Sequence, residues 1–184
     1  SSVYTWKDEF DVLAQKYRVI AVDLKGFGFS AKPDGDYTRH AQGELVAGLL
    51  DQLKIDKAWI VGNSMGGETA LNVAISHPDK VLGLVLIDSA GVKVAGSSSL
   101  SPWYLQIPAV GRLLTALAMT SDRLVRKGLE TSFYDDSKIS DDRVAFYYQP
   151  LRTSGGQLAV TRAKEQFDLL PIEDKLSTIN VPTL

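Results

Sequence analysis

The sequence of 184 residues is long enough for one domain with a hydrophobic core and an inserted subdomain. Its formal net charge of -2 gives no reason to expect nucleic acid or an anionic membrane surface as a partner. The absence of cysteine excludes disulfides, thiolate metal sites and cysteine nucleophiles, and His40 and His77 are too few for a multi-histidine metal site.

The first elements expected along the chain are a helix, a strand and a second helix. Residues 5–17 place apolar side chains at helical spacing, and the apolar run RVIAVD (18–23) is typical of a strand covered on both faces. A glycine- and proline-rich loop, DLKGFGFSAKPDGD (23–36), follows. Residues 38–54 are then expected to form a helix with one apolar stripe, made of Leu45, Val46, Leu49, Leu50 and Leu53.

The next elements repeat this alternation. KAWIV (57–61) and LGLVLID (82–88) indicate buried strands, and residues 65–76 indicate a helix that ends before Pro78. Strands that alternate with helices predict an α/β fold with a mostly parallel sheet flanked by helices. In such a sheet, ligands bind beyond the carboxyl ends of the strands.

The alternation stops after Gly91. Residues 92–170 carry aromatic side chains among polar and charged ones and no convincing buried strand, and INVPTL (179–184) indicates the approach to a further strand. No apolar run approaches the roughly 20 residues that span a bilayer, and no signal peptide opens the sequence. We therefore expect a cytoplasmic protein without a membrane partner.

A G-x-S-x-G motif joins the strand at 57–61 to the following helix. A sharp strand-to-helix turn would expose the Ser64 hydroxyl and present the Met65 N–H to a developing oxyanion. Side chains at positions 62 and 66 are expected to collide with the adjacent strand and helix, which explains Gly62 and Gly66. A strand-to-helix glycine turn that merely connects two elements is the alternative interpretation.

Three stretches together resemble the α/β-hydrolase superfamily, in particular its members with an inserted helical cap: DLKGFGFS (23–30), VGNSMGG (61–67) and HPDKVLGLVLIDSAG (77–91). The resemblance implies an incomplete α/β-hydrolase core over 1–91 and 171–184, and a helical cap over 92–170. It also implies a small-molecule substrate and no cofactor. GFGFSA (26–31) lacks the third glycine of a dinucleotide fingerprint, so NAD binding is not expected.

The family places its triad in the order serine, acid, histidine. No histidine follows residue 91, and the helix that Ser64 opens puts His77 roughly 18 Å from Ser64. His40 does not fit the chain order. The general base and the second oxyanion donor are therefore expected outside these residues, in a polypeptide longer by roughly 80 to 120 residues.

Two interpretations of the acid remain open. Asp88 follows the strand next to the serine turn, where a minority of the family carries its catalytic acid, and the alternative acid lies beyond Leu184. In the other interpretation, which we favour here, Asp88 is a turn residue that binds backbone amides.

Several side chains are candidates for substrate contact. Asn63 adjoins the serine, and the aromatic residues Trp103, Tyr104 and Phe133 of the cap are expected to line an apolar pocket or to pack the cap core. Arg152 and Arg162 are candidates for an acidic substrate group or are simply solvated.

The sequence therefore predicts a serine hydrolase acting on a small ester or related carbonyl compound through an acyl-enzyme. The serine turn GNSMGG (62–67), called the elbow below, is also similar to that of the subgroup that cleaves carbon–carbon bonds in aromatic ring-fission products. Cleavage of such bonds is the first alternative function. A non-catalytic receptor with a hydrolase fold is the second.

Overall fold

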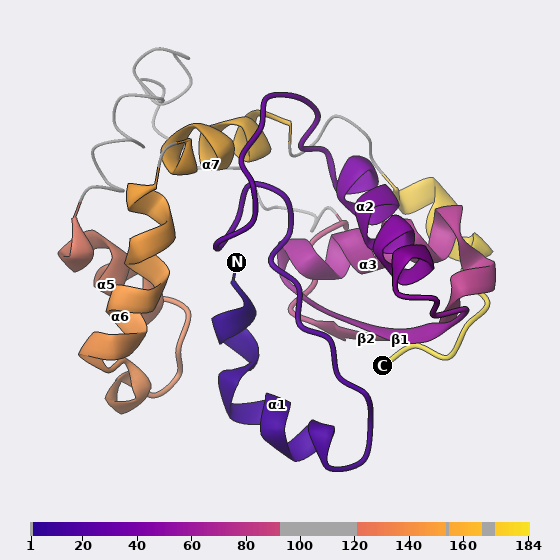
Figure 1. Cartoon of the computed structure of the whole chain (residues 1–184), viewed down its shortest axis with the longest axis horizontal. Coiled ribbons are helices and arrows are strands. Elements are labelled where there is room, and N and C mark those ends of the chain that lie inside the picture. The colour runs from indigo at the N-terminus through magenta and orange to yellow at the C-terminus, as the bar shows by residue number, and fades with distance from the viewer. Residues whose placement is uncertain (1, 93–120, 154, 167–171) are drawn as a thin grey trace. The chain divides into compact units, whose positions relative to one another are not determined.

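The computed structural model describes residues 2–92, 121–153, 155–166 and 172–184 (Figure 1). The chain divides into two compact units. The first unit comprises residues 1–35 and 99–164, and the second comprises residues 36–98 and 165–184. The boundaries expected for an inserted cap, 92–170, remain a prediction.

The second unit contains a parallel pair of strands, β1 (Ala58–Asn63) and β2 (Val81–Ile87). Their register pairs Trp59 with Gly83 and Asn63 with Ile87. The end of the chain adds to β2 in the same direction, because Leu84 N–H donates to Pro182 O at 2.8 Å and Leu184 N–H donates to Leu84 O at 3.0 Å. The strands expected at 57–61 and 82–88 are therefore confirmed, and so is the approach to a further strand at 179–184.

Helix α3 (Met65–Ser76) connects β1 to β2 and packs on one face of these strands, and α2 (Arg39–Gln52) packs against α3 (Figure 1). The short helices η2 (Pro78–Lys80) and η6 (Glu173–Thr178) complete the unit. Its core is aliphatic and consists of Ala70, Leu71, Val73, Ala74, Val81, Leu84 and Ile172.

The face of α2 that is buried differs from the predicted stripe. The buried residues of α2 are Arg39, Gln42, Gly43, Ala47 and Leu50, whereas Leu45 is 50% exposed. Small residues decide this orientation, because a Cβ atom at Gly43 would lie only 3.2 Å from the Cβ atom of Asn72 on α3. Close approach of the two helices therefore outweighs the burial of Leu45.

The face of β1 and β2 that points away from α3 is exposed, whereas the sequence analysis expected strands covered on both faces. Trp59 and Ile87 are 55% and 41% exposed, while Ile60 on the other face packs against the core. The ring of Trp59 covers Gly83, where an added Cβ would lie 2.3 Å from a ring carbon. Within the second unit as described, helices pack on one face of this sheet only.

The regular elements among the described residues of the first unit are all helices, and residues 15–35 form turns and loop. Its helices are η1 (Val3–Trp6), α1 (Lys7–Ala14), α5 (Asp122–Glu130), η4 (Asp136–Lys138), α6 (Asp141–Tyr148), η5 (Gln149–Arg152) and α7 (Gly156–Glu165). The strand expected at 18–23 is absent. A strand requires hydrogen bonds to a neighbour, and the backbone of these residues pairs with no strand in the part of the chain that the structure describes.

Contacts distant in sequence hold the first unit together. Arg143 donates to Asp8 at 2.9 Å, and the Thr5 and Tyr147 hydroxyls lie 2.9 Å apart. The rings of Tyr4 and Phe146 stack with their centroids 4.2 Å apart. Aromatic side chains of α6 therefore pack on the amino-terminal segment.

Among the described residues, no helix combines the length and apolar character that crossing a membrane requires.

A buried ion pair joins α2 to α3 in the second unit. Arg39 Nε lies 3.6 Å from Glu68 Oε2, and their side chains are only 4% and 6% exposed. Arg39 also donates to Tyr37 O at 3.1 Å, and Tyr37 N–H donates to Gln166 Oε1 at 2.6 Å. The pair therefore lies in a polar network inside an otherwise aliphatic unit.

We expect Glu68→Gln to lower the free energy of unfolding by about 3–5 kcal/mol, because it removes the negative charge that faces the buried Arg39 guanidinium. Glu44→Gln is the matched control: Glu44 pairs with His77, but its side chain is 46% exposed, so its loss should cost about 0–1 kcal/mol. Urea unfolding followed by circular dichroism measures both changes. Equal changes would show that burial of the Arg39–Glu68 pair has no special energetic role.

Candidate functional site

Ser64 forms a sharp turn between β1, which ends at Asn63, and α3, which begins at Met65. Its backbone angles are φ 53° and ψ −120°, and the residue is exposed. A positive φ is unfavourable for serine and persists only where surrounding contacts impose it. The predicted strained strand-to-helix turn is therefore present.

Backbone hydrogen bonds hold Ser64 in this conformation. Its N–H donates to Ile87 O at 2.9 Å, which continues the pairing of β1 with β2. Its carbonyl accepts from Gly67 N–H at 2.9 Å, inside the first turn of α3, and from Ala90 N–H at 3.0 Å, in the loop after β2. Hydrogen bonds from β2, from α3 and from the loop after β2 therefore fix the backbone conformation of Ser64.

The first N–H group of α3 is open. In the part of the chain that the structure describes, Met65 N–H donates no hydrogen bond. The start of a helix carries partial positive charge and unsatisfied N–H donors, so it favours a negatively charged oxygen. An anion bound beside Ser64 would therefore meet a donor that folding leaves unused.

The elbow glycines fulfil the prediction only in part. A Cβ atom at Gly62 would lie 2.3 Å from Gly66 O and 2.6 Å from the Gly67 Cα atom, so a side chain is excluded there. The predicted collision at Gly66 is wrong, because a Cβ atom there would meet no atom of the described residues within 4 Å. The described residues thus give no reason for the glycine at position 66.

Gly67 has the role that the sequence analysis gave to Gly66. A Cβ atom at Gly67 would lie 2.3 Å from Ser89 Oγ and 3.0 Å from the Ser89 Cα atom. This glycine lets α3 approach the loop that follows β2. The paired glycines of SMGG were the available signal, but only the tertiary contact with Ser89 shows which of them is required.

Asp88 and Asn63 lie at the same end of the sheet as Ser64. Asn63 Nδ2 donates to Ile87 O at 3.2 Å, so its side chain spans the two strand ends. Asp88 has φ 45° and is exposed. Within the described residues its carboxylate accepts no hydrogen bond, so the interpretation as a turn-stabilising aspartate has no bond to support it, and its role remains a prediction.

Neither His40 nor His77 occupies the position of a general base for Ser64. His77 caps the far end of α3, and its Nε2 lies 2.9 Å from Glu44 Oε1. His40 is an exposed residue in the first turn of α2. In the described ranges, no three His, Asp or Glu side chains gather as metal ligands would.

The remaining candidates belong to the predicted cap. Trp103 and Tyr104 lie outside the described residues, and Phe133 packs its ring 5.2 Å from the Arg143 guanidinium carbon in the first unit. Arg162 pairs with Asp34, and the Arg152 guanidinium lies 5.7 Å from the centroid of the Tyr148 ring. The arginines thus have partners inside the first unit, and substrate contact by the three aromatic residues remains a prediction.

Comparison with known proteins extends this description. A family model described as the alpha/beta hydrolase fold matches residues 1–170. The chain is 34% identical over 145 residues to the 2-hydroxymuconate semialdehyde hydrolase of Pseudomonas sp. strain CF600, a match covering 78% of this chain and 47% of that relative. It is 32% identical over 155 residues to the 2-hydroxy-6-oxo-2,4-heptadienoate hydrolase of Pseudomonas putida F1, covering 84% and 52%.

Solved structures give the same fold. The epoxide hydrolase CorEH superposes with a TM-score of 0.83 at 25% identity, covering 100% of this chain and 69% of that one. The meta-cleavage product hydrolase of Pseudomonas fluorescens IP01 superposes with a TM-score of 0.77 at 25% identity, covering 100% and 65%. The chain spans about half the length of the curated relatives described above.

The glycine contacts predict how substitutions at the elbow will rank. Gly62→Ala and Gly67→Ala should each lower the free energy of unfolding by about 2–3 kcal/mol, because the new methyl group meets atoms closer than 3 Å. Gly66→Ala is the matched control and should change it by less than about 1 kcal/mol. Thermal unfolding of the three variants measures the order. A Gly66→Ala variant as unstable as the other two would contradict the described packing.

Proposed function

Because the chain belongs to the α/β hydrolase fold family, we propose that it forms part of a hydrolase in which Ser64 is the nucleophile. The supporting observation is the conformation of Ser64, an exposed residue on a strained turn at the start of a helix. A serine hydroxyl is a weak nucleophile, so this position has value only if a base and an oxyanion donor act with it.

In the proposed reaction, Ser64 Oγ attacks the carbonyl carbon of the substrate. Charge develops on the carbonyl oxygen and is stabilised by Met65 N–H at the start of α3. A histidine supplied from outside these 184 residues takes the hydroxyl proton and returns it to the leaving group. Water then releases the acyl group from Ser64.

The names of the relatives favour one substrate class. Matches to hydrolases of 2-hydroxymuconate semialdehyde and 2-hydroxy-6-oxo-2,4-heptadienoate support the alternative from the sequence analysis, carbon–carbon bond cleavage in ring-fission products, over simple esters. The fold alone does not select between these substrate classes, because an epoxide hydrolase has the same fold. We therefore propose a carbonyl compound of the ring-fission type as substrate.

A receptor of the same fold is the rival proposal. It would retain the turn at Ser64 without turning over a ligand. Covalent reactivity of Ser64 separates the two proposals.

We expect a fluorophosphonate to label the full polypeptide at Ser64. Ser64→Ala should abolish labelling and lower kcat by about 10⁴-fold or more, because both depend on the hydroxyl. Ser89→Ala is the matched control, since Ser89 lies in the loop after β2 but its hydroxyl donates to Ala90 O at 2.7 Å. Peptide mapping by mass spectrometry locates the adduct. Absence of any adduct in the wild type would favour the receptor.

The substrate class is tested by comparing two carbonyl compounds. We expect kcat/KM for 2-hydroxymuconate semialdehyde to exceed that for 4-nitrophenyl acetate by at least about tenfold, because a site shaped for one substrate rejects another that lacks its polar groups. Absorbance of the dienolate and of 4-nitrophenolate reports the two rates. Faster hydrolysis of 4-nitrophenyl acetate would contradict the ring-fission substrate class and favour small esters as substrates.

A further inference from the structure

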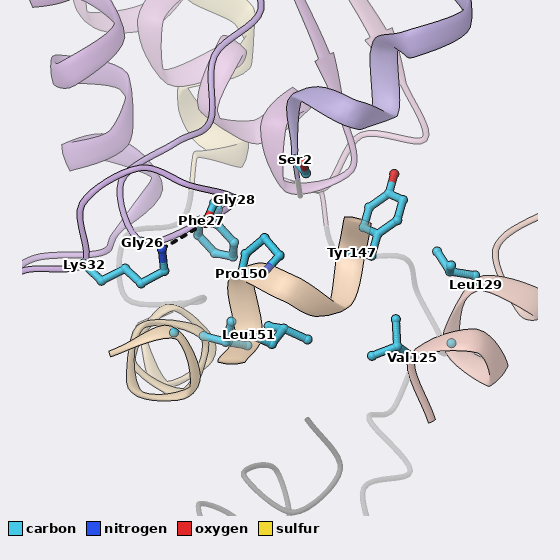
Figure 2. Close-up of a pocket in the computed structure, with 13 residues that line it drawn as sticks. Ser2, Gly26, Phe27, Gly28, Lys32, Val125, Leu129, Tyr147, Pro150 and Leu151 are labelled. Carbon is cyan, nitrogen blue, oxygen red and sulfur yellow. Dashed lines mark hydrogen bonds between the residues drawn. The ribbon is translucent and has the colours of Figure 1, made fainter. Parts of the chain in front are cut away.

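The first unit contains a cavity of about 240 Å³ that the proposed reaction does not use. Figure 2 shows the side chains that line it, among them Val125, Leu129, Tyr147, Pro150 and Leu151. These come from α5, α6 and η5, and the turn at residues 26–28 forms another part of the lining. The lining is therefore largely apolar.

Among the described residues that line this cavity, one side chain is charged, that of Lys32. Its amino group is turned toward the turn at residues 26–28 (Figure 2) and donates to Gly28 O in that turn and to Ser30 O beyond it, each at 2.9 Å. A lysine ammonium carries three N–H donors. Two are used by these carbonyls, and one remains for another acceptor.

No carboxylate neutralises Lys32 among the described residues. The two nearest acids in sequence have other partners: Asp23 accepts from Val3 N–H at 2.7 Å and Phe29 N–H at 2.9 Å, and Asp34 pairs with Arg162. A partly buried charge is stabilised most effectively by an opposite charge that also accepts its hydrogen bond. The cavity thus combines apolar walls with one cation that lacks an anion.

From this combination we propose that the cavity binds a small apolar carboxylate, with the carboxylate on Lys32 and the apolar part against Val125, Leu129 and Leu151. The volume limits the ligand: 240 Å³ lies below the roughly 300–1,000 Å³ of ordinary small-molecule pockets, so the ligand must be compact, about the size of benzoate. The proposal concerns the first unit by itself and does not depend on the role of Ser64.

A purely structural role for Lys32 is the competing explanation. Its two bonds to backbone carbonyls would then serve only to hold the loop over residues 24–32. That role requires a donor at this position but no preference for an anionic ligand, so the two explanations differ in what they predict for charged and neutral ligands.

The test is ¹⁹F NMR titration of the full polypeptide with 4-fluorobenzoate and with the neutral 4-fluorobenzamide. We expect 4-fluorobenzoate to bind at least about tenfold more tightly, because only the carboxylate pairs with Lys32. Lys32→Met should remove that difference and Lys32→Arg should retain most of it. Lys57→Met, an exposed lysine of the second unit, should leave it unchanged.

A second measurement locates the ligand without any variant. In ¹H–¹⁵N spectra of the wild type, 4-fluorobenzoate should shift the amide signals of Gly26, Gly28 and Gly156, which line the cavity. Leu129→Trp, which fills the cavity, should abolish binding of both compounds. Equal affinity for the two compounds, or shifts confined to Met65 and Gly66, would overturn the proposal.

Discussion

The backbone of Ser64 depends on the pairing of β1 with β2. Its angles, φ 53° and ψ −120°, store strain of about 1–3 kcal/mol, and such strain persists only where neighbouring structure imposes it. Ile87 O and Ala90 N–H, from the second strand and the loop after it, both bond to Ser64. If β2 did not lie parallel to β1, both bonds would be lost and the serine would relax into an ordinary conformation.

Close contacts between backbones complete this arrangement. Gly62 permits the first turn of α3 to cross the end of β1, and Gly67 permits the same turn to approach Ser89. Behind the turn, the aliphatic core of α3 and the buried Arg39–Glu68 pair fix the helix against α2. In this pair, the free-energy cost of removing two charges from water is offset by their mutual attraction, so the helix packing depends on both charges staying paired.

The fold and the chemistry are separate questions for this chain. An epoxide hydrolase and a meta-cleavage product hydrolase superpose on it with similar TM-scores, 0.83 and 0.77, so the architecture alone does not select a reaction. Selection rests on individual groups. The proposed reaction assigns this part to the Ser64 hydroxyl and the Met65 N–H in the second unit, and the Lys32 ammonium in the first unit is a group of a different kind.

The sequence by itself determined the alternation of strands and helices over residues 57–88 and the position of the serine turn. Both follow from local patterns, namely short apolar runs, helical periodicity and glycines flanking one serine. It did not determine which face of α2 is buried, since the choice between Leu45 and the small residues Gly43 and Ala47 depends on how closely α3 approaches. Nor did it distinguish Gly66 from Gly67, because only the position of Ser89 in space separates a glycine that is required from one that is not.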